Sequence, residues 1–258
     1  MNKQSLFPIK QTKIIATIGP VTSSLEMLEQ LLLAGMNVIR INSSHGNTEI
    51  HKEIISNIRK LDNELNTSTS ILIDLQGPKL RIGEIVGGQI DLVDKEHLVI
   101  KVGTGEGTDG VLYTDYDKFA EDVNPGEPIL LDDGKIHLEV IKSDGKSEVT
   151  CKIIHGGILS SRKGLNLPQT KISLPCITKK DEEDLAFALD ENVDWIGLSF
   201  VRSSSDIDKL KKIINQRKKH ARVVAKIEKP EAIVDLDAII EASDAVMIAR
   251  GDLGVEVP

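Results

Sequence analysis

The chain has 258 residues and a formal net charge of −8, from 32 basic and 40 acidic side chains. This acidic balance argues against a general nucleic-acid-binding protein, and an aromatic content of 3% leaves few side chains on which bases could stack. Two cysteines, Cys151 and Cys176, are too few for a disulfide framework or a zinc site, and no apolar run approaches the length of a membrane span. We therefore expect a cytoplasmic protein with a substantial core.

Strand-like and helix-like segments alternate over the first 75 residues. The apolar patterns predict strands at residues 13–18, 36–41 and 71–75, and helices at residues 23–34 and 48–65. Ser23 and Glu26 have the spacing of a capping box, so we expect the first helix to begin there.

The pattern changes between residues 83 and 175, where no helix is predicted. Short alternating runs are broken by Gly, Asp and Pro, which is typical of β-strands and turns. The predicted strands are residues 89–93, 97–102, 128–131, 135–141 and 147–154. We expect a small all-β domain, residues 83–175, inserted between two parts of an α/β domain, residues 1–82 and 176–258.

The alternation returns after the insert. The predicted helices are residues 178–190, where Thr178 and Asp181 form a capping box, residues 205–219, and a helix with Pro230 in its first turn. The predicted strands are residues 195–200, 222–227 and 245–249. Repeated βα units predict either a doubly wound sheet or a (β/α)₈ barrel.

Three charged residues follow the last two predicted strands. Lys226 and Glu228 close the run 222–227, and Asp252 follows the run 245–249 in the segment Arg-Gly-Asp-Leu-Gly. Two carboxylates at the rim of a parallel sheet suit a hard cation such as Mg²⁺, and a nearby lysine suits phosphoryl transfer or enolate stabilisation. Structural ion pairs are the alternative, but the glycines near Asp252 favour the close approach of a ligand.

Other polar clusters lie at strand ends or in the insert. Arg40, in RINSSHG, could bind a phosphate with two hydrogen bonds, and Asp74 ends the third strand. Arg162 and Lys163 lie on a glycine turn where a cation could reach a polyphosphate. Each has an ordinary alternative: a polar turn, a helix cap or a solvated pair. The basic stretch 209–222 is interpreted as the solvated face of an amphipathic helix.

Taken in order, these motifs resemble those of the pyruvate kinase family, and the resemblance covers nearly the whole chain. The matching stretches are TKIIATIGP from Thr12, MNVIRINSSHG from Met36, DLQGPKLRIG from Asp74, ILLDDGKI from Ile129, KGLNLP from Lys163, LPCITKKDEEDLAFAL from Leu174, SFVR from Ser199, KIEKPEA from Lys226 and MIARGDLGVE from Met247.

The resemblance implies a TIM-type (β/α)₈ barrel, here incomplete with about six strands, and makes the β insert a hinged lid. It implies phosphoryl transfer from phosphoenolpyruvate to ADP, giving pyruvate and ATP in the last step of glycolysis. It further implies Mg²⁺ or Mn²⁺ as cofactor and a homotetrameric parent protein. We expect no nucleic-acid or membrane partner.

The family's residue roles carry over position by position. The catalytic positions, which also bind the substrate, match Arg40 and Lys226. The substrate-binding turn matches Gly251 and Asp252, and the Mg²⁺ ligands match Glu228 and Asp252. The nucleotide-side positions match Asn42, His45, Arg81 and Lys163. The K⁺ site of the family matches Asn42, Ser44, Asp74 and Leu75.

The chain departs from the family pattern at two points that bear on function. Many members read D-T-K-G-P-E where this chain has Asp74 to Lys79, and the ammonium of Lys79 could supply the charge that K⁺ otherwise brings. We therefore expect that K⁺ is not required. The sequence also stops at Pro258 after six predicted barrel strands, so we expect a fragment or a truncated gene product.

Two other functions stay open at this point. A different barrel that handles phosphoenolpyruvate or pyruvate, such as a Mg²⁺-dependent lyase or aldolase, could use the same Lys, Glu and Asp. A catalytically inactive barrel fragment could bind only a ligand or a partner chain.

Overall fold

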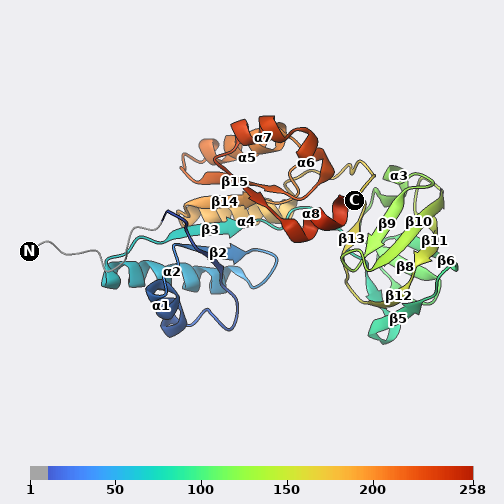
Figure 1. Cartoon of the computed structure of the whole chain (residues 1–258), viewed down its shortest axis with the longest axis horizontal. Coiled ribbons are helices and arrows are strands. Elements are labelled where there is room, and N and C mark those ends of the chain that lie inside the picture. Colours follow the sequence, from blue (N-terminus) through green and yellow to red (C-terminus); the bar gives the residue numbers. More distant parts are fainter. Residues whose placement is uncertain (1–10, 258) are drawn as a thin grey trace, which may run out of the picture. The chain divides into compact units, whose positions relative to one another are not determined.

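The computed structural model describes residues 11–257, which form two compact units. Unit 1 comprises residues 11–77, 177–226 and 237–247, and unit 2 comprises residues 78–176, 227–236 and 248–257. Figure 1 shows the helices and strands of both units, coloured along the sequence. Among the described residues, no helix is long and apolar enough to cross a membrane.

A curled parallel sheet forms the centre of unit 1. Its strands are β1 (Ile15–Thr17), β2 (Val38–Asn42), β3 (Ser70–Asp74), β14 (Trp195–Leu198), β15 (Arg222–Ile227) and β16 (Ala245–Ile248). They lie side by side in chain order, and β1 to β15 pair in parallel. A doubly wound sheet would reverse its strand order at a switch point, so this order identifies an incomplete barrel.

Helices follow the strands, as βα units require. They are α1 (Leu25–Leu33), α2 (Thr48–Leu65), α4 (Lys179–Asp190), α5 (Ser204–Gln216) and α7 (Leu236–Ala242). The predicted capping box of Thr178 and Asp181 is confirmed at the start of α4. The predicted box of Ser23 and Glu26 is wrong, because Ser24 is the cap and accepts a hydrogen bond from the backbone N–H of Met27.

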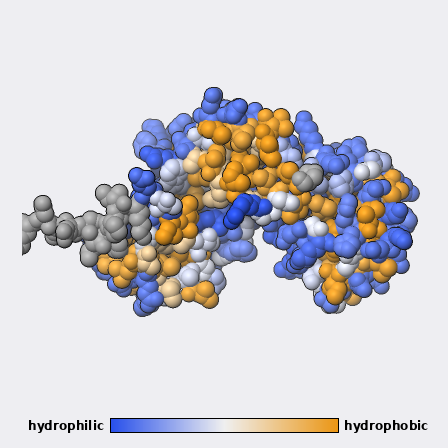
Figure 2. Space-filling view, in the orientation of Figure 1, coloured by the Kyte–Doolittle hydropathy of each residue, from blue (hydrophilic) through white to orange (hydrophobic). Residues whose placement is uncertain are grey.

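The inner strands β3 and β15 are buried on both faces, whereas the edge strands of the sheet are not. All residues of β3 after Ser70 are buried, and so are all residues of β15 after Arg222, as in parallel sheets covered on both sides. At the edges, Ile15 of β1 is 50% exposed and Ile248 of β16 is 54% exposed. Figure 2 shows apolar residues at the surface on the face that it displays.

Unit 2 contains the inserted β domain. Its strands are β4 (Glu84–Ile85), β5 (Gln89–Leu92), β6 (His97–Val102), β7 (Glu106–Gly107), β8 (Val111–Thr114), β9 (Pro128–Leu131), β10 (Ile136–Ser143), β11 (Glu148–His155), β12 (Gly157–Ser160) and β13 (Leu165–Asn166). The main sheet has the order β13-β9-β10-β11-β6-β8. It mixes antiparallel pairs with one parallel pair, β6 with β8.

Unit 2 also contains short helices. They are η1 (Val86–Gly88), α3 (Phe119–Asp122), α6 (Pro230–Val234) and α8 (Arg250–Glu256). Helix α3 corrects the expectation of no helix between residues 83 and 175. Its four residues are too few for a helical period to appear in the sequence, and its Phe119 is fully buried in the core of the domain.

The capping box of α4 also fixes the loop that follows β3. Asp181 is fully buried, and its Oδ2 accepts hydrogen bonds from the backbone N–H and hydroxyl of Thr178 at 2.8 and 2.6 Å. Its Oδ1 accepts from the backbone N–H of Gly77 at 3.1 Å. One side chain therefore connects the start of a helix to a loop at the carboxyl end of the sheet.

The substitution Asp181→Ala is expected to lower the free energy of unfolding by about 3 kcal/mol, because it removes a helix cap and leaves buried donors unpaired. Urea denaturation followed by circular dichroism measures this change. Glu182→Ala, at an exposed position in the same helical turn, is the matched control and should change stability by less than about 0.5 kcal/mol. Equal losses in the two variants would contradict the role assigned to Asp181.

Candidate active site

The polar residues of unit 1 gather at the carboxyl ends of neighbouring parallel strands. Arg40 lies on β2, Asp74 is the last residue of β3, and Lys226 lies near the end of β15. The strand register places Asn42 beside Asp74 and Asp74 beside Gly197. Barrel enzymes build their active sites at this edge of the sheet.

Asp74 is the centre of a buried network of charges. Its side chain is 2% exposed, and its Oδ2 accepts hydrogen bonds from Nε of Arg40 at 2.8 Å and from Nη2 of the same guanidinium. Its Oδ1 lies 3.2 Å from Nζ of Lys226. One carboxylate therefore fixes two cations that the sequence places far apart.

Ser199 belongs to the same network, and the sequence analysis did not select it as a site residue. Nζ of Lys226 donates a hydrogen bond to Oγ of Ser199 at 2.7 Å, and this hydroxyl donates to the backbone carbonyl of Leu75 at 2.6 Å. A signal was available, because Ser199 follows the apolar strand β14 just as other site residues end or follow their strands.

Two glycines leave room for these contacts. A Cβ on Gly197 would lie 3.0 Å from Oδ1 of Asp74, so the glycine leaves space for the buried carboxylate. Gly77 has a φ of +68°, and a Cβ there would lie 2.8 Å from the ring of Phe200. The backbone therefore restricts which residues these two positions can hold.

Among Arg40, Lys226 and Asp74, positive charges outnumber negative charges. Arg40 and Lys226 carry two positive charges, and Asp74 carries one negative charge. The side chain of Arg40 is 24% exposed, so part of its guanidinium reaches the surface, and its Nη1 donates to Oγ1 of Thr17 at 2.8 Å. A phosphate or carboxylate arriving at this end of the sheet would meet positive charge that is already fixed in place.

Unit 2 contains the two carboxylates expected to bind a metal ion. Glu228 directly follows β15 and is 1% exposed, whereas Asp252 lies in the first turn of α8 with its side chain 40% exposed. Within residues 11–257, no group of three or more His, Cys, Asp or Glu side chains could enclose a metal ion. Two carboxylates still fit Mg²⁺, which takes few protein ligands and keeps positions for water and substrate oxygens.

The segment around Asp252 is helical, and Gly251 and Asp252, the residues expected to form the substrate-binding turn, lie in the first turn of α8. A Cβ on Gly251 or on Gly254 would meet no atom of the described residues within 4 Å, and neither residue has a positive φ. Packing against the described residues therefore does not explain why these two positions are glycine.

Three of the four residues expected to form a K⁺ site, Asn42, Asp74 and Leu75, have oxygen atoms with protein partners. Oδ1 of Asn42 accepts from the backbone N–H of Ser44 at 3.0 Å, and the carbonyl of Leu75 accepts from Ser199. Both oxygens of Asp74 face cations, as described above. In unit 2, Nζ of Lys79 lies 3.8 Å from Oδ1 of Asp252.

The residues expected to lie on the nucleotide side of the site belong to both units. In unit 1, Asn42 ends β2, and the backbone carbonyl of the exposed residue His45 lies 2.8 Å from Nε2 of His51. In unit 2, Nη1 of Arg81 donates to the backbone carbonyl of Arg162 at 3.1 Å. Both arginines line a cavity of about 650 Å³ in unit 2.

Lys163 is held by a carboxylate that the sequence analysis did not identify. Its Nζ lies 2.7 Å from Oδ1 of Asp132, and Nζ of Lys135 donates to Oδ2 of Asp132 at 2.8 Å. Hydrogen bonds from Lys135 and, to a smaller extent, from Lys163 hold the pKa of Asp132 below its usual value. Asp132 thus stays charged and orients Lys163, in the same way that Asp74 orients two cations in unit 1.

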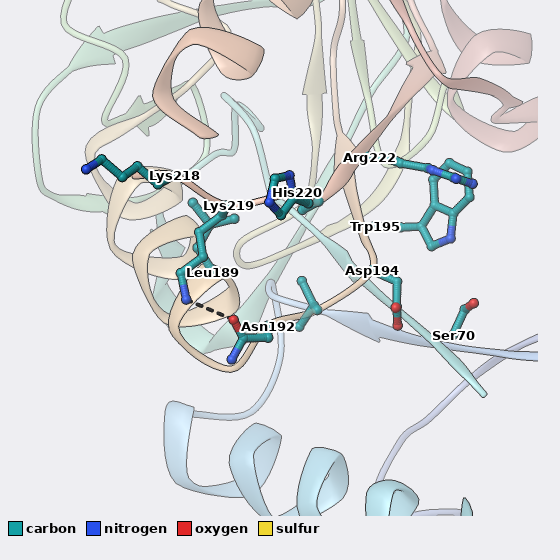
Figure 3. A pocket seen from close by; sticks show the side chains of 11 residues that line it. Ser70, Leu189, Asn192, Asp194, Trp195, Lys218, Lys219, His220 and Arg222 are labelled. Carbon is teal, nitrogen blue, oxygen red and sulfur yellow. Dashed lines mark hydrogen bonds between the residues drawn. The ribbon is translucent and has the colours of Figure 1, made fainter. Parts of the chain in front are cut away.

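A second hollow, of about 610 Å³, lies in unit 1 at the amino-terminal ends of β3, β14 and β15. Figure 3 shows Arg222 stacked beside Trp195, and its guanidinium carbon lies 5.4 Å from the ring centroid. Nζ of Lys219 donates a hydrogen bond to Oδ1 of Asn192 at 2.9 Å. Lys218 points away from the other labelled side chains. This is the opposite end of the strands from Asp74, so the hollow is not the candidate active site.

Comparison with known proteins gives the family. The model of the pyruvate kinase barrel domain matches residues 9–258. The chain is 45% identical over 252 residues to pyruvate kinase 2 of Synechocystis sp., covering 96% of this chain and 43% of that protein. It is 44% identical over 251 residues to pyruvate kinase of Staphylococcus aureus (strain MRSA252), covering 97% of this chain and 43% of that protein. The chain thus spans less than half the length of these relatives, and it belongs to the pyruvate kinase family.

Proposed function

We propose that this chain carries the phosphoryl-binding and metal-binding part of a pyruvate kinase, which transfers a phosphoryl group from phosphoenolpyruvate to ADP. The observation that carries the proposal is the pair of cations, Arg40 and Lys226, fixed on the buried carboxylate of Asp74. Phosphoryl transfer needs positioning and positive charge more than covalent chemistry, and this network supplies both.

In the proposed reaction, an oxygen of the ADP β-phosphate bonds to the phosphorus of phosphoenolpyruvate as the bond from phosphorus to the enol oxygen breaks. The enolate that leaves takes a proton at its terminal carbon and becomes pyruvate. Arg40 and Lys226 bind the phosphoryl oxygens and balance their charge during the transfer. Glu228 and Asp252 would hold Mg²⁺, which would supply further positive charge to stabilise the anionic substrate.

The remaining assignments follow the family positions. Gly251 and Asp252 contribute to the substrate site, and the inserted domain, residues 83–175, acts as a lid that excludes water. The nucleotide side comprises Asn42, His45, Arg81 and Lys163. For the whole protein, we carry over the cytoplasmic homotetramer that the family implies.

The test is the binding of phosphoenolpyruvate to the 258-residue chain with Mg²⁺, measured by isothermal titration calorimetry. We expect binding, and we expect Lys226→Met to weaken it about 10- to 100-fold, because a charge-assisted hydrogen bond to phosphate is worth roughly 1.5–3 kcal/mol. Lys60→Met, at a half-exposed lysine of α2, is the control and should bind normally. A folded chain that binds no phosphoenolpyruvate, or equal losses in the two variants, would contradict the proposal.

Pyruvate formation in the same samples separates the proposed reaction from that of a barrel lyase. A kinase forms pyruvate only when ADP is present and forms ATP in equal amount, whereas a lyase or hydrolase does not depend on ADP. Binding without turnover would mean that this portion holds the substrate but lacks groups needed for transfer. Pyruvate formation without ADP would overturn the assignment to phosphoryl transfer.

A second prediction concerns K⁺. Because Lys79 brings a fixed positive charge and three of the K⁺-site residues have oxygen atoms with protein partners, the affinity for phosphoenolpyruvate should be the same in K⁺ as in a bulky organic cation such as tetramethylammonium. Lys79→Glu replaces that positive charge with a negative one and should make binding respond to K⁺. A marked gain with K⁺ in the unaltered chain would show that Lys79 does not replace it.

A third prediction concerns the network itself. Asp74→Asn leaves Arg40 and Lys226 close together without their shared counter-charge, so the free energy of unfolding should fall by about 3–5 kcal/mol. The control is Glu64→Gln, which removes a carboxylate from a half-exposed pair with Lys60 and should cost less than about 1 kcal/mol. Chemical denaturation of both variants gives the comparison, and a stable Asp74→Asn chain would remove Asp74 from its central role.

A further inference from the structure

Unit 2 contains a buried ion pair that the proposed reaction does not use. Nζ of Lys229 lies 2.8 Å from Oε2 of Glu256, with their side chains 4% and 2% exposed. The other oxygen, Oε1, accepts a hydrogen bond from Nδ2 of Asn166 at 2.7 Å. Oε1 of Glu256 thus has a hydrogen-bond partner, whereas the buried Oε2 accepts no hydrogen bond within the described residues and is balanced only by the charge of Lys229.

The pair connects the two segments that hold the carboxylates of the proposed metal site. Lys229 directly follows Glu228 in the sequence. Glu256 lies four residues after Asp252 in α8, so the two side chains lie on the same face of that helix, one turn apart. A contact between Lys229 and Glu256 therefore restrains the backbone that carries Glu228 relative to the backbone that carries Asp252.

Stability alone is a poor explanation for this ion pair. Burying two charges costs so much desolvation that apolar residues of similar size often stabilise a protein equally well. Glu256 also lies in the last turn of α8, where the helix dipole disfavours a negative charge. With seven residues, α8 is too short to be stable by itself, so contacts of this kind determine where the helix lies.

Asn166 extends the network to the inserted domain. It is the last residue of β13, which pairs with β9 in the main sheet of that domain. Its hydrogen bond to Glu256 joins this sheet to the helix that carries Asp252. A displacement of β13 would therefore act on α8 through one buried side chain.

We propose that Lys229, Glu256 and Asn166 are positioning residues that hold Glu228 and Asp252 at the relative placement that a divalent cation requires. This inference rests on the proposed function, because it takes these two carboxylates as the metal ligands. Residues behind metal ligands commonly change metal affinity 10- to 100-fold when they are substituted. The same range is expected here.

The experiment measures Mn²⁺ binding to the 258-residue chain by the loss of the free-ion electron paramagnetic resonance signal, without substrate or turnover. Glu256→Gln should raise the Kd for Mn²⁺ about 10- to 100-fold. Asn166→Ala, which leaves the ion pair in place, should raise it by a smaller factor. Both variants are checked for folding by circular dichroism.

Two further variants make the result decisive. Asp62→Asn weakens the hydrogen bonds that a buried carboxylate of unit 1 makes with Thr67 and Thr69, so it should lower stability but leave Mn²⁺ affinity unchanged. Asp252→Asn removes a proposed ligand and should abolish specific Mn²⁺ binding. If Asp252→Asn has no effect, the metal site of the proposed function is wrong.

If Asp252→Asn abolishes binding but a folded Glu256→Gln chain keeps the original Kd, the positioning role is overturned and the proposed function stands. If Glu256→Gln does not fold, Asn166→Ala decides, and an unchanged Kd in that variant overturns the inference. An equal loss of affinity in Asp62→Asn and Glu256→Gln would also overturn it, because general destabilisation would then explain both.

Discussion

The buried carboxylate of Asp74 is the interaction on which the candidate site depends. Arg40 and Lys226 are cations on strands that do not neighbour each other in the sheet, and each contacts the same carboxylate between them. A buried charge without a partner is strongly unfavourable, so the two cations can stay close together only because Asp74 balances part of their charge. The remaining positive charge is what an anionic substrate can bind.

This arrangement requires particular backbone positions as well as particular side chains. The strands follow one another in chain order, and the register aligns Asp74 with Gly197 on the next strand. A larger residue at position 197 would place its Cβ 3.0 Å from the carboxylate. Lys226 then reaches across from β15 to the same carboxylate and to Ser199. The chain order of the strands, the glycine at position 197 and the balance of charges therefore all help to hold these side chains together.

The sequence was most informative where local pattern and burial agree. The apolar run 222–227 predicted β15 to the residue, and the polar residues after such runs define the candidate site. Local pattern could not reveal which side chains meet. Nothing in the local sequence indicates that Lys229 is buried and paired with Glu256, 27 residues later in the chain. No helix was predicted to begin at Arg250, because two glycines in seven residues conceal a helical pattern held in place by tertiary contacts.

The segment Lys226-Ile227-Glu228-Lys229 contains, within four residues, one lysine of each of the two buried ion networks. The chain passes from unit 1 to unit 2 after Lys226. Lys226 is anchored on Asp74 in unit 1, and Lys229 is anchored on Glu256 in unit 2. Glu228 lies between two lysines that are each fixed by a buried carboxylate, so its backbone is restrained on both sides. If Glu228 is the metal ligand that we propose, it would need little reorganisation when a cation binds, because ion pairs next to it already restrain its backbone.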